Sequence, residues 1–195
     1  RAAAVLLISG SVAYGAQAAD PAKVLRIAFP AAETGFDPVR VSDTYSATVN
    51  EAIYERLLTY DFLARPAKIR PEVAEAMPEV SDGGRTYTFR IRKGVFFTPD
   101  PAFGGKPREL TADDFVYTFK RFVDPKNRSP WAFMLEGRIE GLDELIEAAK
   151  RHGRFDYDAR VSGLQALDRH TIRFRLKQPN HVFLYTLAHS PFGAM

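Results

Sequence analysis

Alternation between apolar and polar side chains predicts three β-strands in this chain. The clearest case runs from Arg85 to Phe97, where aromatic and aliphatic residues alternate with threonine and arginine. A period of two is typical of a half-buried strand. The same pattern predicts a second strand from Thr171 to Leu176, and the run from Val24 to Phe29 predicts a third, short strand that stops at Pro30.

Apolar residues that recur every three or four positions predict helices around these strands. The predicted helices are Thr44 to Tyr60, Ala112 to Val123, a segment from Leu142 that closes at Gly153, and Phe183 to Ala188. The segment from Glu72 to Met77, bounded by prolines, is expected to form at most one helical turn.

The helix that begins at Ala112 has the strongest start signal. Thr111 is placed to act as the N-cap, and Asp114 is placed to complete a capping box with it. Leu110 and Phe115 can form a hydrophobic staple across the same turn. We therefore expect this helix to bury its phenylalanines, which are Phe115, Phe119 and Phe122.

The order of these elements indicates an α/β fold of the mixed α+β kind. Helices and strands alternate irregularly, without the glycine fingerprint of a nucleotide-binding βαβ unit and without an internal repeat. The helix expected at residues 183–188 has no partner element after it. The chain is therefore interpreted as a fragment of a longer protein.

The first 18 residues have the layout of a secretory signal peptide. Arg1 precedes a short run of small and apolar residues, and Ala16-Gln17-Ala18 matches the usual cleavage pattern. A buried helix or a membrane anchor fits less well, because the run is shorter than the roughly 20 residues that span a bilayer. Part of the charged leader would be missing, since the sequence starts with arginine. We expect an exported domain over residues 19–195.

Composition narrows the possible environments and partners. The sequence has no cysteine, which excludes disulfides, thiolate metal sites and a lipid-modified cysteine. A free periplasmic protein without a membrane anchor of its own is therefore expected. The 27 Lys and Arg against 24 Asp and Glu give a net charge of +3, but the two signs are mixed along the chain. Nucleic acid is not an expected partner, because no basic stripe emerges.

Catalytic motifs are not found in the sequence. None of the histidines has a metal-ligand spacing or a nucleophile motif beside it. They are His152, His170, His181 and His189. We therefore expect a protein that is not an enzyme and that needs no metal or cofactor.

Five segments, in the same order, resemble the family 5 extracellular solute-binding proteins of ABC importers, the oligopeptide-, dipeptide- and nickel-binding group. They are Phe36 to Pro38, Ile53 to Leu58, Gly84 to Phe97, Leu110 to Arg121, and Ala166 to Pro179. Each segment alone would be weak support for the resemblance. Five segments in register along the mature chain make the resemblance to this family specific. The longer loop from Thr98 to Glu109 departs from the family pattern.

The resemblance implies a periplasmic-binding-protein type II-like fold, in which two lobes close on a ligand by a hinge motion. Because family members are usually far longer, this chain would hold only the N-terminal lobe with its inserted subdomain, and the second lobe would be missing. The resemblance also implies a periplasmic monomer that delivers a small solute, with peptide favoured, to the membrane permease subunits of an ABC importer.

By the same resemblance, the loop Ala32-Glu33-Thr34-Gly35 should face the ligand, and its backbone could pair with an extended peptide. Trp131 occupies the place of a cleft aromatic residue and would supply an apolar wall and one N–H donor. Tyr45 is a further candidate. Other interpretations stay open: Trp131 could belong to the core or its rim, Glu33 to a solvated loop, and Tyr45 to helix packing.

The expected function is therefore the capture of peptides or a similar small solute for import. Two alternatives stay open at this point. The protein could be an interaction or docking module without a ligand of its own, or it could bind a nickel or haem chelate with the same fold. We expect the 195-residue chain alone to bind ligand weakly or not at all, because half of the cleft would be missing.

Overall fold

The computed structural model of the chain describes residues 22–24 and 26–195. The chain divides into two units, residues 1–30 and 31–195. In the first unit, none of the described residues belongs to a helix or strand, so the strand predicted from Val24 to Phe29 is wrong for this part. Val24 and Ile27 are 73% and 76% exposed, and no described strand pairs with their backbone, as a strand requires. The predicted signal peptide, residues 1–18, lies outside the described residues.

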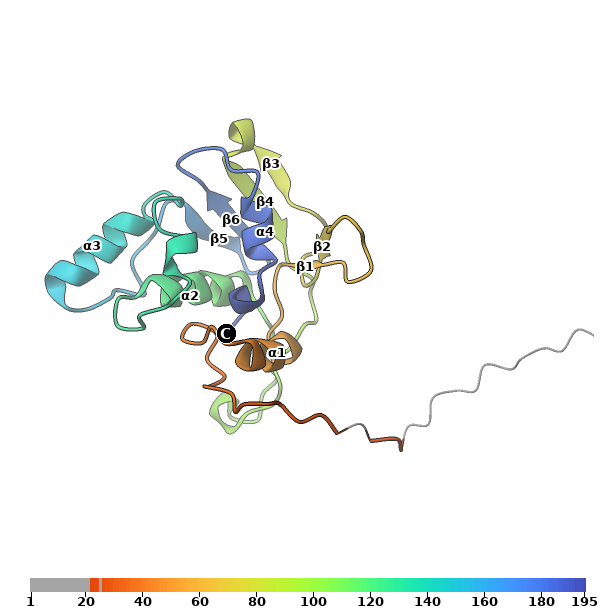
Figure 1. Cartoon of the computed structure of the whole chain (residues 1–195). Helices are drawn as coiled ribbons and strands as arrows, with labels where there is room; N and C mark the ends of the chain where they lie inside the picture. The colour runs from red at the N-terminus through yellow and green to blue at the C-terminus, as the bar shows by residue number, and fades with distance from the viewer. Residues whose placement is uncertain (1–21, 25) are drawn as a thin grey trace, which may run out of the picture. The chain divides into compact units, whose positions relative to one another are not determined.

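An antiparallel sheet of four strands is the centre of the second unit (Figure 1). In spatial order its strands are β3 (Glu79–Ser81), β4 (Thr86–Arg90), β6 (Thr171–Arg175) and β5 (Leu164–Asp168). The two central strands place Tyr87 opposite Phe174 and Phe89 opposite Ile172. These four side chains are buried, and their neighbours along each strand are threonine and arginine. The strand predicted at residues 171–176 is thus confirmed.

The strand predicted from Arg85 to Phe97 is shorter than expected. Beyond β4, only isolated bridges continue the pairing, at Ile91 with Ala74 and at Phe96 with Glu109. Gly94 lies between these bridges with φ +76°, a left-handed conformation that glycine adopts at little cost. This glycine turns the backbone and ends the regular alternation.

Four α-helices and a small hairpin complete the described fold. The helices are α1 (Thr44–Ile53), α2 (Ala112–Val123), α3 (Leu142–His152) and α4 (Phe183–Leu187), and the hairpin strands are β1 (Leu58–Tyr60) and β2 (Ile69–Pro71). Short 3₁₀ turns are η1 (Asp82–Gly84), η2 (Pro101–Phe103), η3 (Ala132–Met134) and η4 (Ser190–Phe192). The helices predicted at 112–123, 142–152 and 183–188 are confirmed, the last one residue shorter than expected.

The helix predicted from Thr44 to Tyr60 ends at Ile53 instead. The chain then runs extended, and both Leu57 and Leu58 are fully buried although they are adjacent. The extended backbone makes this possible, because successive side chains of a strand point to opposite sides. Backbone bonds from Glu72 and Val73 to this segment hold it in place. Tertiary pairing overrides the helical pattern here.

The core is built mainly from phenylalanine and lies between α2 and the inner face of the sheet. The ring of Phe174 contacts Phe119 at 5.1 Å and Phe183 at 5.4 Å between centroids. Phe192 of η4 stacks on Phe119 at 5.6 Å, so the last described turn closes over α2. The predicted burial of Phe115, Phe119 and Phe122 is confirmed.

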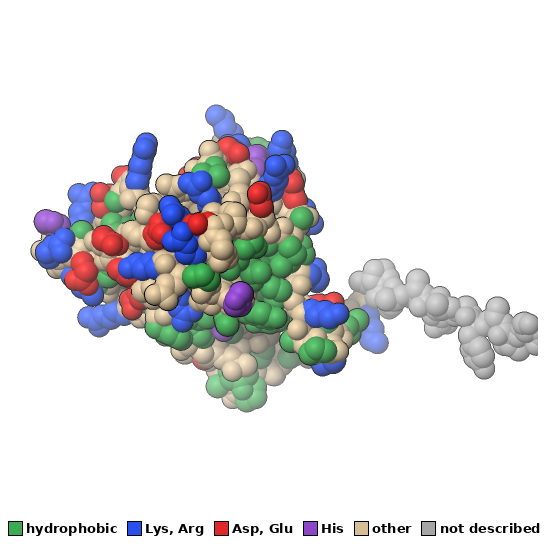
Figure 2. All heavy atoms as spheres, turned by 90° about the horizontal axis from the view of Figure 1, so that it is seen from above, with side chains coloured by type: hydrophobic (Ala, Val, Ile, Leu, Met, Phe, Trp, Pro, Cys, Tyr) green, Lys and Arg blue, Asp and Glu red, His purple; other side chains and the backbone are tan. Residues whose placement is uncertain are grey.

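Hydrophobic side chains form a patch on one face of the second unit. In Figure 2, hydrophobic side chains gather toward the side where Figure 1 shows the β1–β2 hairpin, and charged ones gather toward the side of α3. Exposed apolar side chains on the first side include Tyr60 and Tyr185, whose rings lie 6.3 Å apart.

The predicted capping box at the start of α2 is confirmed. The buried carboxylate of Asp114 accepts hydrogen bonds from the backbone N–H of Thr111 at 2.7 Å and from its hydroxyl at 2.9 Å. The guanidinium of Arg108 donates to both oxygens of the same carboxylate. One carboxylate therefore joins the entry loop to the first turn of the helix.

We predict that Asp114→Ala lowers the free energy of unfolding by about 2 kcal/mol, because it leaves a backbone N–H and a guanidinium without their acceptor. Urea unfolding of the complete gene product, followed by circular dichroism, measures this loss. The control is Asp113→Ala, since Asp113 is exposed in the same turn. Equal losses in the two variants would contradict the assigned role of Asp114.

Candidate ligand-binding site

The loop that precedes α1 is fastened to the N-terminus of that helix by Thr34. Its backbone N–H donates to the Ser46 hydroxyl at 3.0 Å, and its hydroxyl donates to the Asp43 carboxylate at 2.5 Å. Asp43 is the N-cap of α1 and also accepts from the Ser46 N–H at 2.8 Å. These hydrogen bonds, from Ser46 first and Thr34 next, hold the pKa of Asp43 well below its usual range. A charged carboxylate thus ties the loop to the positive end of the helix.

A second anchor lies at the far end of the same loop. The carboxylate of Asp37 accepts from the guanidinium of Arg121 on α2 at 2.8 Å. The Tyr54 hydroxyl donates to the carbonyl of Phe36 at 3.1 Å. The loop is therefore fixed on both sides of Gly35 by groups from two different helices and the segment after α1.

Before these anchors, the loop has backbone N–H and C=O groups at Ala32 and Glu33 that are available for hydrogen bonds. Ala32 and Glu33 are exposed, and neither makes a hydrogen bond with another described residue. The next backbone N–H, that of Thr34, is already bound to Ser46. A fixed loop with open N–H and C=O groups can pair with an extended chain without first having to be ordered.

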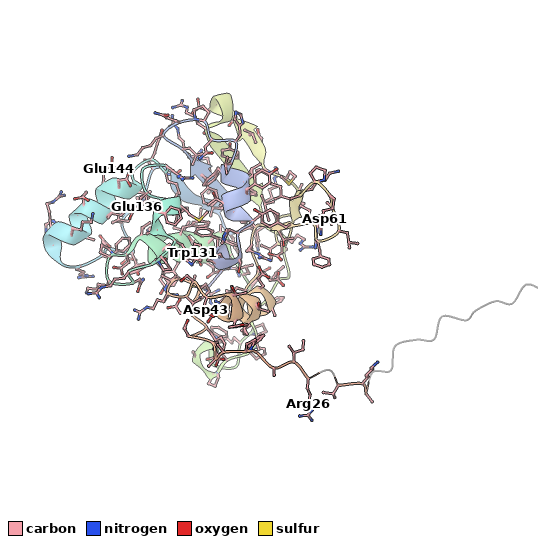
Figure 3. All side chains as sticks on the ribbon, in the orientation of Figure 1. Arg26, Asp43, Asp61, Trp131, Glu136 and Glu144 are labelled. Carbon is pink, nitrogen blue, oxygen red and sulfur yellow. The ribbon has the colours of Figure 1, made fainter. Side chains whose placement is uncertain are left out.

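Trp131 lies close to this loop, half-buried at the start of η3 (Figure 3). Its indole N–H donates to the carbonyl of Val41 at 2.8 Å. The N–H donor that was expected for a ligand is thus used within the protein. The indole ring packs against His189, with centroids 4.9 Å apart. What remains for recognition is the apolar face of the ring.

The segment around residues 41–46 brings three of the predicted site residues together. Trp131 binds Val41, Thr34 binds Asp43 and Ser46, and Tyr45 lies half-buried in the first turn of α1. Ala32, Glu33 and Gly35 belong to the loop that Thr34 anchors.

His189 packs against the candidate residue Trp131, although its sequence position did not indicate this. Burial lowers the pKa of its imidazole, and its Nδ1 is buried without a hydrogen-bond partner among the described residues. Asp37 and Arg121 were also not predicted. They are 84 positions apart, and no local pattern connects them.

A hollow on another part of the described chain includes none of the predicted residues. One of about 630 Å³ lies beside α2 and β5 and is lined in part by Tyr117, Lys120 and Tyr157. The Lys120 ammonium donates to the carbonyls of Tyr157 and Ala159, both at 2.7 Å, and so joins a loop to α2. The Lys120 side chain in the lining is therefore a structural cross-link.

Within residues 22–24 and 26–195, no group of three or more His, Cys, Asp or Glu side chains is arranged to hold a metal ion. None of the helices seen in the described chain has the length and apolar character to cross a membrane.

The described fold matches part of solved periplasmic binding proteins. The chain aligns with the Haemophilus influenzae OppA complex with RPPGFSPFR at a TM-score of 0.66 and 25% identity, covering 84% of this chain and 28% of that one. It aligns with Helicobacter pylori DppA in complex with the peptide STSA at 0.63 and 26%, covering 84% and 29%. The fold is that of a periplasmic binding protein of the OppA and DppA type.

The sequence places the chain more narrowly. Residues 68–195 match the model of bacterial extracellular solute-binding proteins, family 5, and the chain belongs to this family. It is 33% identical to di/tripeptide-binding protein 2 of Pseudomonas aeruginosa over 97% of this chain, and 32% identical to the periplasmic oligopeptide-binding protein OppA of Escherichia coli over 78%. The chain spans 32% and 25% of the length of these relatives.

We predict that His189 makes the stability of the protein depend on pH. An unfolded imidazole takes up a proton near pH 6.5, whereas burial keeps the folded one neutral to lower pH. The unfolded state then binds more protons, so the free energy of unfolding should fall as the pH drops from 7 to about 5.

Urea unfolding at several pH values measures this slope. His189→Asn should flatten it, while His181→Asn, at an exposed position, should leave it unchanged. A slope that persists in full after His189→Asn would rule out this imidazole as the cause.

Proposed function

We propose that the complete protein is the periplasmic binding component of an ABC importer and that its ligands are short peptides. The observation that carries the proposal is the loop of Ala32 and Glu33, which is fixed at Thr34 and leaves its backbone groups open. Family membership supports the same conclusion, because relatives of this chain are named as oligopeptide- or dipeptide-binding proteins.

In this proposal the loop recognises what all peptides share. Backbone N–H and C=O groups at Ala32 and Glu33 would pair with the ligand backbone as an added strand does. Such pairing is independent of the ligand side chains, so peptides of different sequence would be accepted. The anchors of the loop at Asp43 and Arg121 limit the entropy that must be lost on binding.

The side chains around the loop would then form the surface that contacts the side chains of the peptide. Trp131 offers the face of its indole, since its N–H is bound to Val41. Tyr45 and Gly35 would line the same surface. An apolar face without a free donor fits side chains by contact area, and this also favours broad ligand acceptance.

The remaining parts of the proposal concern the cellular setting. We infer that a leader within residues 1–18 directs export, that the mature protein works as a periplasmic monomer, and that it delivers its ligand to the permease subunits of the importer. The remainder of the complete protein would form the second lobe and the opposite wall of the cleft. The 195-residue chain alone is then expected to bind peptide weakly or not at all.

Native mass spectrometry of the complete gene product, purified from the periplasm without denaturation, tests the ligand class. A spread of added masses that match short peptides is expected. A single discrete adduct would move the ligand to a chelate or another small molecule. A bare protein that also fails to bind a peptide library would favour a docking module.

We predict that Trp131→Ala raises the dissociation constant for peptide about tenfold, because an apolar wall is lost. Trp131→Phe should change it by no more than about threefold, since the ring is kept and the N–H is not offered to the ligand. Isothermal titration calorimetry with a peptide identified by mass spectrometry gives the values.

Phe133→Ala is the matched control, because this aromatic residue lies two positions away and is 62% exposed. A urea unfolding curve for each variant separates loss of binding from loss of fold. Unchanged affinity in a folded Trp131→Ala protein would exclude Trp131 from the ligand site.

A further inference from the structure

A second feature of the surface is a hollow of about 610 Å³ at the end of α3, whose lining includes five cationic side chains. Three parts of the chain supply them: the loop before α1, the turn after α2, and the end of α3 with the residues that follow it. The cationic residues are Arg40, Lys126, Arg128, Lys150 and Arg154. All five are exposed.

The anionic group in the lining of this hollow is already bound within the protein. Asp124 is the single acidic residue in the lining, and it is buried. One of its carboxylate oxygens accepts from the backbone N–H of Lys126 at 2.9 Å, and the other accepts from the Tyr157 hydroxyl at 2.8 Å. The lining as a whole therefore stays strongly positive.

Two of the cations have an acidic side chain within 4 Å. Arg40 lies 3.7 Å from Asp37, but that carboxylate makes a closer pair, at 2.8 Å, with Arg121. Lys150 pairs with Glu147 at 2.8 Å, with both side chains more than half exposed, so water and salt weaken the interaction. Neither pair removes the cation from the hollow.

The turn that carries Lys126 and Arg128 is rigidly built. The Asn127 side-chain amide donates to the carbonyl of Arg121 at 2.9 Å, and its backbone N–H donates to the carbonyl of Asp124 at 2.9 Å. Arg40 donates to the side-chain oxygen of Asn127 at 3.3 Å, which joins two of the three parts of the lining. The cations are thus gathered by the fold and not by a flexible tail.

Gathering like charges costs free energy through mutual repulsion. The chain has nearly equal numbers of cationic and anionic residues, 27 and 24, so this local excess departs from its overall balance. A ligand with more than one negative charge would offset the repulsion, and the planar guanidinium groups of Arg40, Arg128 and Arg154 suit the oxygen geometry of phosphate.

We propose that this hollow binds a ligand that carries phosphate groups, either free in solution or in the headgroups of an anionic membrane lipid. The site is separate from the proposed peptide site, because its lining includes none of residues 32–35, Tyr45 or Trp131. Phosphate binding should therefore proceed with or without bound peptide, and it should weaken steeply as salt is added.

The test uses the complete gene product and the double variant Lys126→Glu with Arg154→Glu, which changes two exposed cations from different parts of the lining. The control is Arg92→Glu with Lys93→Glu, an equal change of charge at exposed positions outside the hollow. Calorimetry with inorganic pyrophosphate measures a soluble ligand, and sedimentation with phosphatidylglycerol vesicles, compared with phosphatidylcholine vesicles, measures a lipid headgroup.

We expect the first variant to lose at least about tenfold in affinity for one of these probes, and the control to lose less than about twofold. Binding of pyrophosphate would identify a soluble phosphate compound, and binding only of phosphatidylglycerol vesicles would identify a headgroup. The proposal is overturned if the protein binds neither probe, or if the two double variants lose affinity equally. Unchanged peptide binding by both variants shows that the fold is kept.

Discussion

The described fold depends on a cluster of phenylalanine rings in which strands, helices and the last turn meet. Phe174 on β6 contacts Phe89, Phe119 and Phe183, and Phe192 covers the ring of Phe119. Each such pair adds about 1 kcal/mol to the free energy gained from burying the rings. Because η4 is held over α2 by these contacts, His189 lies against Trp131, and the end of the chain packs beside α1. The proposed peptide site is therefore supported by the core beneath it.

Polar interactions fix the positions of the loops. Asp43 caps α1 and holds Thr34, while Arg121 reaches from α2 to Asp37. Such bonds contribute little net stability in water, but they select one loop conformation from many. Apolar packing thus stabilises the fold, whereas hydrogen bonds with charged groups position the few residues that are proposed to contact a ligand.

Elements that short-range patterns determine could be predicted from the sequence. The period of two in β6 and the capping box of α2 are local signals, and both elements lie where they were predicted. The helix predicted through Leu57 and Leu58 was wrong, because pairing with residues 72–74, which are distant in the sequence, fixes an extended backbone there. The positions of Trp131 and the loop at residues 32–35 were indicated by family resemblance. The pair of Asp37 and Arg121 could not be predicted, since no local pattern connects residues so far apart.

Contacts between residues that are distant in the sequence also determine when this chain can fold. The Tyr87 hydroxyl of a central strand donates to the carbonyl of Asn180, 93 positions away. The ring of Phe192, near the end of this sequence, stacks on Phe119 in the core. Bringing such distant segments together costs loop entropy before any contact repays it. A ribosome that has released only the first half of the chain will thus hold a polypeptide in which β4 still lacks its partner β6. Until β6 and η4 are available, the aromatic side chains of β4 and α2 lack the rings that cover them in the folded chain.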